Sequence, residues 1–79
     1  MLSGAQIRAA RHGLRWTAHD LASRANVSVS TVKRIEVDDQ VPAVSARNLQ
    51  AVRTALEAAG IEFIGTPDDG PGIRIRAQK

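Results

Sequence analysis

The chain has 79 residues, a formal net charge of +3 and no cysteine, which fits one small domain and excludes disulfide bonds and thiolate metal sites. No apolar run approaches the roughly 20 residues that span a bilayer, and the N-terminus lacks a leader-like apolar segment, so we expect a cytoplasmic protein with no membrane partner. A domain of this size buries limited apolar surface, and we therefore expect a second copy of the chain to supply more burial.

Two short helices are predicted over residues 4–12 and 18–25, because a capping-box pair stands at the start of each. The pairs are Ser3 with Gln6 and Thr17 with Asp20. Gly13 is the predicted stop of the first helix. Asn26 is the predicted stop of the second, since asparagine tolerates the left-handed backbone that often ends a helix.

A third helix is predicted over residues 29–36, with Ser28 as its cap only two residues after Asn26. So tight a turn brings the second and third helices into direct contact, with Val32 and Ile35 facing the second helix. The outward face of the third helix is mostly short polar groups and cations, namely Val29, Ser30, Thr31, Lys33 and Arg34. Such a face suits a DNA groove lined with phosphates and base edges.

The third helix is expected to end at the Asp38-Asp39 loop, and a fourth helix is predicted over residues 46–59 with Gly60 as its stop. After Gly60 the apolar period becomes alternating: IEFIG and GIRIR flank TPDDGP, which indicates a β-hairpin with a turn of six residues. The helical core is expected to comprise Ile7, Ala10, Leu14, Trp16, Leu21, Ala22, Ala25, Val27, Val32, Ile35, Leu49, Val52 and Leu56.

The chain therefore divides into a helical domain, residues 1–60, and a C-terminal hairpin segment, residues 61–79. A lone hairpin is marginal in water, so this one needs a surface to pack on. We expect it to form the interface of a homodimer through its apolar side chains, Ile61, Phe63, Ile64, Ile73 and Ile75. The alternative is a hairpin that folds back onto its own helices.

The basic residues are concentrated in the first half of the chain. Residues 1–36 hold six Arg and Lys against two Asp and Glu, a net charge of +4, whereas the remainder holds five against six, a net charge of −1. The basic half coincides with the three helices above, as expected for a module that displaces counterions from DNA. An ordinary solvated charged face is the alternative interpretation.

Residues 6–58 resemble the lambda-repressor-like helix-turn-helix regulators of the Cro/Xre type. The resemblance is carried by Leu21, Ala22, Ala25, Val27, Ser28, Val32, Ile35 and Glu36 at the family's spacing. It implies a mainly α fold of four to five helices, here followed by the small hairpin, and a structural ion pair between Arg11 and Glu36. Two departures are Ala18, where the family commonly has a phosphate-binding glutamine, and Asn26, where it has glycine.

The expected partner is double-stranded DNA. Arg34 is expected to bind a guanine edge, beside base contacts from Ser30 and Thr31 and a thymine-methyl contact from Val29. Lys33 is expected to bind phosphate, and Ser28 is first a helix cap with a possible phosphate contact in second place. Arg47 and Asn48, in the first turn of the fourth helix, are candidates for a phosphate clamp, with a solvated surface as the alternative.

We expect a homodimeric, sequence-specific transcriptional regulator, most simply a repressor acting by occupancy. The alternative is a protein-binding adaptor, such as a type II antitoxin or a factor that contacts RNA polymerase. We expect no enzyme: His12 and His19 stand without a nucleophile or a metal-ligand set, and no phosphate-binding or dinucleotide motif occurs. No cofactor, metal or small-molecule ligand is evident from the residues.

Overall fold

The computed structural model describes residues 2–37, 42 and 44–76. Within these ranges the chain is mainly helical and ends in a two-stranded antiparallel sheet. The elements are α1 (Gly4–Gly13), α2 (Ala18–Ala25), α3 (Val29–Val37), α4 (Ala46–Ala58), β1 (Ile61–Thr66) and β2 (Asp69–Ile75). The predicted helices are therefore confirmed to within one residue at each end, while the predicted Asp38-Asp39 stop lies outside the described residues.

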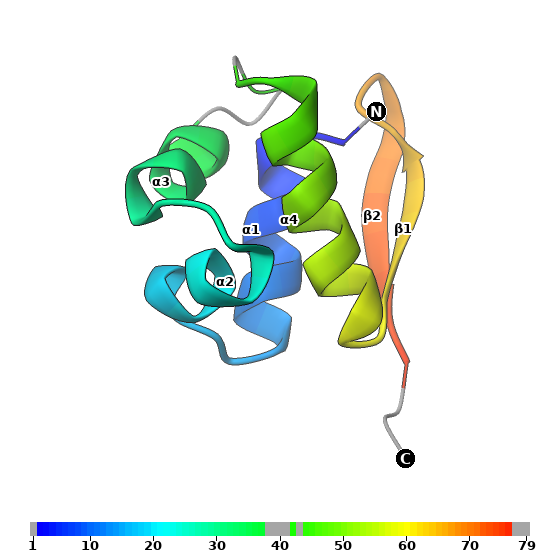
Figure 1. Cartoon of the computed structure of the whole chain (residues 1–79). Helices are drawn as coiled ribbons and strands as arrows, with labels where there is room; N and C mark the ends of the chain where they lie inside the picture. The colour runs from blue at the N-terminus through cyan, green and yellow to red at the C-terminus, as the bar shows by residue number, and fades with distance from the viewer. Residues whose placement is uncertain (1, 38–41, 43, 77–79) are drawn as a thin grey trace.

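Helices α1 and α4 lie side by side in the middle of the molecule, with α2 and α3 on one side and the hairpin on the other (Figure 1). Helix α2 packs on both α3 and α4, and α3 also packs on α1. Strand β2 contacts α1, and β1 contacts α4. The α2–α3 pair is thus supported from behind by the two central helices.

The predicted helix caps are present. Ser3 Oγ accepts the N–H of Gln6 at 3.1 Å, and the Gln6 side chain accepts the N–H of Ser3 at 3.0 Å. Thr17 and Asp20 form the same reciprocal pair at 3.0 and 2.9 Å. Asn26 ends α2 in the left-handed region, with φ of 58°. These contacts are local in sequence, which is why the sequence predicted them.

Gly13 was predicted to stop the first helix, but α1 includes it and is capped by Leu14. A Cβ on Gly13 would lie 2.6 Å from Cδ1 of Ile75, which is the end of a flexible, half-exposed side chain that can move aside. The chain turns two residues later, where Arg15 has a left-handed φ of 60°. Gly13 therefore lies where β2 approaches the end of α1.

The hydrophobic core matches most of the predicted set and differs at its edges. Leu2 and Ile61 belong to it, with exposures of 4% and 3%, although neither was predicted. Four predicted members only flank the core and remain partly exposed: Leu14, Trp16, Val27 and Leu49. They lie in turns or at helix margins, where only one side of each side chain meets the core.

The hairpin folds back onto its own helices, which was the alternative to pairing across a dimer. Ile61 is buried in the core of its own chain, so its predicted place in a dimer interface is corrected. Phe63 and Ile73 are partly buried against the same core. Ile64 and Ile75 keep 38% and 51% of their surface exposed and remain accessible to a partner.

The predicted six-residue turn of the hairpin is wrong. Thr66 pairs with Asp69, so the turn proper is Pro67-Asp68 and both strands are longer than expected. The register shifts between Ile64 and Thr66, where Gly65 adopts a φ of 74°. Glycine and proline signals in the sequence were interpreted as turn, whereas here they mark an irregularity inside the ladder.

The Gln6 side chain links α1 to both strands of the hairpin through hydrogen bonds. Its Nε2 donates to the carbonyl oxygens of Ile64 at 3.1 Å and Gly72 at 3.0 Å, and the residue is only 3% exposed. Gln6→Ala should lower the free energy of unfolding by about 3 kcal/mol, because it removes three hydrogen bonds at roughly 1 kcal/mol each, namely the two to the strands and the one from the Ser3 N–H. Urea denaturation measures this.

Gln50→Ala is the matched control, since the Gln50 side chain is exposed and bonds only to Thr54 within the same helix. Its effect should stay within roughly 0.5 kcal/mol. If the two substitutions lower the free energy of unfolding equally, the hydrogen bonds of Gln6 do not stabilise the docking of the hairpin on α1.

In the ranges that the structure covers, none of the helices has both the length and the apolar character of a membrane span.

Candidate nucleic-acid interface

Helices α2 and α3 are joined by a short turn that keeps them in contact. After Asn26, the N–H of Val27 donates to the carbonyl of Ala22 at 3.0 Å, which closes the end of α2. Val32 and Ile35 of α3 are fully buried, with 0% exposure. The sequence predicted both as inward-facing, and burying them directs the opposite side of α3 away from the core.

Ser28 caps α3, as predicted. Its Oγ accepts the N–H of Thr31 at 3.1 Å and lies 2.9 Å from the Thr31 hydroxyl. Both hydroxyls therefore already have a partner inside the protein. A contact from Ser28 to a ligand would be secondary to its capping role.

The outward face of α3 is open to solvent. Ser30, Lys33 and Arg34 are exposed, and Thr31 is partly exposed. Val29 differs from the expectation, because it packs partly against the core and presents only part of its side chain. The structure thus brings four of the five predicted face residues to one accessible surface.

The two cations of this face have no fixed partner within the described part of the chain. Neither Lys33 nor Arg34 makes a hydrogen bond or ion pair there. Their ammonium and guanidinium groups are therefore open to solvent. Exposed Lys and Arg side chains are the groups that bind DNA phosphates and the O6 and N7 atoms of guanine.

Arg11 and Glu36 form the ion pair that the resemblance implied. Arg11 Nε lies 2.7 Å from Glu36 Oε2 and Nη2 lies 2.9 Å from Oε1, a bidentate geometry. Their side chains are only 15% and 10% exposed, and the hydrogen bond with Glu36 raises the pKa of Arg11. Arg11 also donates to the carbonyl of Trp16 at 2.9 Å. The pair therefore fixes the end of α3 against α1 and against the start of α2.

Arg8 is a positioning residue that the sequence reasoning missed. Its Nη1 donates to the main-chain carbonyl of Glu36 at 2.7 Å. Arg8 precedes Arg11 by three residues, so both side chains lie on one face of α1, and this spacing was the available signal. Two arginines of α1 thus hold the last turn of α3.

The first turn of α4 offers less than predicted. Arg47 is exposed, but Asn48 is partly buried and its N–H donates to Ser45 Oγ at 3.1 Å. One of the amides expected to clamp a phosphate is therefore already used by the helix cap. Arg47 retains its role as a candidate phosphate contact, and Asn48 is the weaker of the two.

The start of α2 is likewise already capped by an anion. The Asp20 carboxylate accepts the N–H of Thr17, and this hydrogen bond, together with one from the Thr17 side chain, lowers the pKa of Asp20. At neutral pH a negative charge therefore occupies the helix N-terminus. Ala18 also offers no side-chain hydrogen-bond donor, so phosphate binding by the first turn of α2 has little support.

No protein-family model matches this chain, and no curated protein matches it at a significant level. The observations that bear on function are therefore the open cationic face of α3 and the buried ion pair that orients it.

Proposed function

We propose that α2 and α3 form a helix-turn-helix and that the protein is a sequence-specific, DNA-binding transcriptional regulator similar to the Cro/Xre type. The observation that carries the proposal is the exposed polar and cationic side of α3, which no described part of the chain covers. A short helix with its apolar side anchored and its polar side open has the shape and chemistry to enter a major groove.

Within that groove each residue has a separate role. Arg34 donates two hydrogen bonds to O6 and N7 of a guanine, and Ser30 and Thr31 contact neighbouring base edges. Lys33 binds phosphate, which contributes affinity without sequence preference. Val29 contributes at most part of its surface to a thymine methyl, because its other part packs on the core.

A homodimer would place two copies of α3 in successive major grooves, with half-sites about 34 Å apart. The hairpin supports this through Ile64 and Ile75, which are large, apolar and still exposed. Binding over a promoter would block polymerase, so repression is the simplest mode of action. Sedimentation that yields only monomer at tens of micromolar concentration would contradict the dimer.

The same exposed isoleucines favour one other candidate function, a protein-binding adaptor whose hairpin engages a toxin or RNA polymerase. An adaptor without DNA binding predicts no preference among DNA sequences. The experiment on α3 below therefore separates the two functions.

Electrophoretic shifts with fragments selected from random DNA should show opposite behaviour for the two cations of α3. Arg34→Ala should remove about 1–3 kcal/mol of discrimination at the guanine position. Lys33→Ala should weaken all sequences alike and reduce the salt slope by about 1. Both side chains are exposed, so neither substitution should alter the melting temperature.

Arg53→Ala removes the same charge from α4, where Arg53 pairs with Glu57, and serves as the control. Its affinity and its salt slope should stay close to those of the unmodified protein. If Arg34→Ala leaves specificity intact, the assignment of the base-reading residue is wrong; if no DNA is selected at all, the proposed function is wrong.

A further inference from the structure

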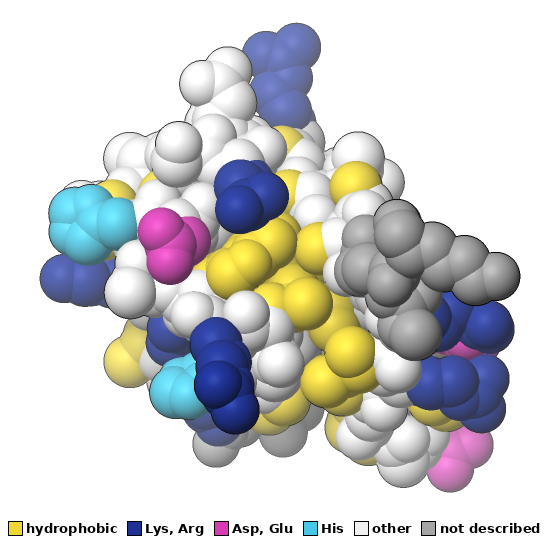
Figure 2. Space-filling view, turned by 90° about the horizontal axis from the view of Figure 1, so that it is seen from below, with side chains coloured by type: hydrophobic (Ala, Val, Ile, Leu, Met, Phe, Trp, Pro, Cys, Tyr) yellow, Lys and Arg dark blue, Asp and Glu magenta, His cyan; other side chains and the backbone are white. Residues whose placement is uncertain are grey.

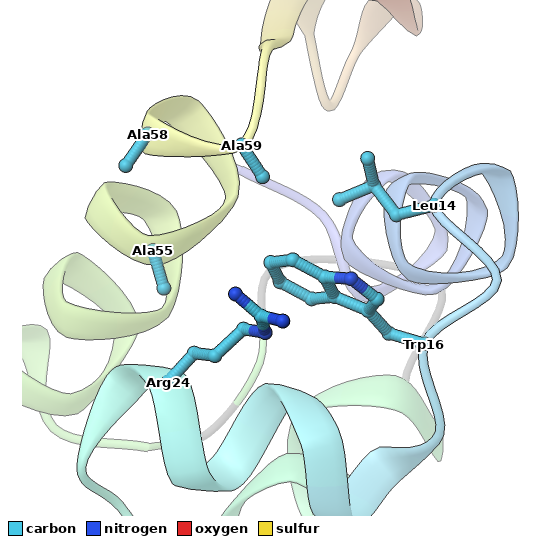
Figure 3. A pocket seen from close by; sticks show the side chains of 6 residues that line it. All are labelled: Leu14, Trp16, Arg24, Ala55, Ala58 and Ala59. Carbon is cyan, nitrogen blue, oxygen red and sulfur yellow. The ribbon is translucent and has the colours of Figure 1, made fainter. Parts of the chain in front are cut away.

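An apolar cleft of about 510 Å³ opens where the end of α1, α2 and the C-terminal end of α4 meet. It is lined by Leu14, Trp16, Arg24, Ala55, Ala58 and Ala59 (Figure 3). Seen from this side of the molecule, hydrophobic side chains gather at the centre of the face, with a basic side chain against them (Figure 2). None of these six residues belongs to the outward face of α3.

The cleft exists because its walls are unequal in size. One wall is the end of α4, where the side chains of Ala55 and Ala59 point toward Arg24 and Trp16 and are too short to fill the space, while that of Ala58 points outward (Figure 3). The opposite wall is formed by Leu14 and the indole of Trp16, both of which stay partly exposed. A flat apolar group would contact both walls and exclude water from them.

Arg24 gives the cleft a charge. Its guanidinium stacks on the Trp16 ring with 4.3 Å between the guanidinium carbon and the ring centroid. Stacking uses the flat face of the guanidinium and leaves its N–H edges pointing away from the ring. No residue in the described ranges accepts a hydrogen bond from these N–H groups. The carboxylate of Asp20, one turn earlier on α2, accepts the N–H of Thr17, and its charge interacts with that of Arg24 without a hydrogen bond between them.

We propose that this cleft binds a small organic carboxylate. Its apolar body, best a flat ring, lies between Trp16 and the alanines of α4, and its carboxylate accepts a bidentate pair of hydrogen bonds from Arg24. The volume falls within the roughly 300–1,000 Å³ of small-molecule sites. The proposal does not depend on DNA binding.

Trp16 is the only tryptophan in the chain, so intrinsic fluorescence reports on the cleft. Titration with phenylacetate should change this emission saturably, and the neutral isostere phenylacetamide should bind about tenfold more weakly, because it lacks the charge-assisted hydrogen bonds. Arg24→Gln should weaken phenylacetate binding by about tenfold and leave phenylacetamide unchanged. Arg53→Gln, on the other side of α4, should change neither affinity.

Ala59→Leu enlarges the side chain that points toward Trp16 in Figure 3, and it should abolish binding of both probes. Far-ultraviolet circular dichroism should remain unchanged, since Ala59 is partly exposed and follows the last residue of α4. The proposal is overturned by an emission that does not respond to phenylacetate, by equal affinity for the amide, or by binding that survives Ala59→Leu. It is also overturned if the emission without probe depends on protein concentration and Ala59→Leu removes that dependence, because a second copy then fills the cleft. Since the titration contains no DNA, its failure is distinct from failure of the proposed function.

Discussion

Glu36→Gln should lower the melting temperature by roughly 15 °C, the consequence of losing about 3 kcal/mol in a domain of this size. The glutamine side chain cannot accept both guanidinium hydrogen bonds, and the charge of Arg11, only 15% exposed, is left without its counter-ion. The last turn of α3 then keeps the hydrogen bond from Arg8 to its main chain but loses the bidentate ion pair with Arg11. Thermal melting followed by circular dichroism at neutral pH measures the change.

Glu57→Gln is the matched control, because it removes the same charge from an exposed pair. Arg53 and Glu57 are 40% and 42% exposed and lie four residues apart on α4, so their loss should cost less than about 1 kcal/mol. Similar melting temperatures for the two variants would contradict the structural importance of the Arg11–Glu36 pair. If the proposed function holds, Glu36→Gln also weakens DNA binding, whereas Arg34→Ala weakens it without affecting stability.

Gly65→Ala should destabilise the protein by about 3 kcal/mol through backbone strain and a steric clash. Gly65 has a φ of 74°, and a Cβ there would lie 2.3 Å from the carbonyl oxygen of Gly70. Because the backbone of residue 65 fixes the position of its Cβ and the oxygen belongs to the backbone of Gly70, no side-chain rotation relieves the contact. Urea denaturation gives the free energy, and amide exchange should show that loss of protection is largest in β1 and β2.

Gly72→Ala is the control, which tests whether replacing any glycine of the hairpin by alanine destabilises the protein as much as Gly65→Ala. A Cβ at Gly72 meets no atom within 4 Å, so the effect should remain within roughly 1 kcal/mol. If both substitutions destabilise the protein to a similar extent, the positive φ of Gly65 and its close approach to Gly70 are not the cause of the effect.

The helices could be predicted because their ends are determined by neighbours in sequence. The capping boxes at Ser3 and Thr17 and the left-handed Asn26 each involve residues at most five positions apart. The Arg11–Glu36 pair could be expected only through resemblance to a family, since it joins residues 25 positions apart. Interactions between neighbouring residues were therefore enough to predict the helices, whereas this long-range ion pair could be predicted only from the resemblance.

The features that were missed all depend on tertiary packing. Whether Ile61 faces its own core or a partner depends on where α4 directs β1, which no alternating pattern specifies. The stacking of Arg24 on Trp16 depends on an α4 whose alanines leave the indole uncovered. Gly13 is the residue type that commonly stops a helix, but α1 includes it, and its neighbour in space is Ile75 of β2.

The bond from Gln6 to Gly72 spans 66 positions, so it closes a loop of nearly the whole chain. The contacts between α2 and α3, by contrast, involve neighbours and cost little loop entropy to form. We therefore expect the helices to assemble first and the hairpin to dock last. During synthesis, the surface of α1 that later receives β2 stays uncovered until β2, residues 69–75, has left the ribosome.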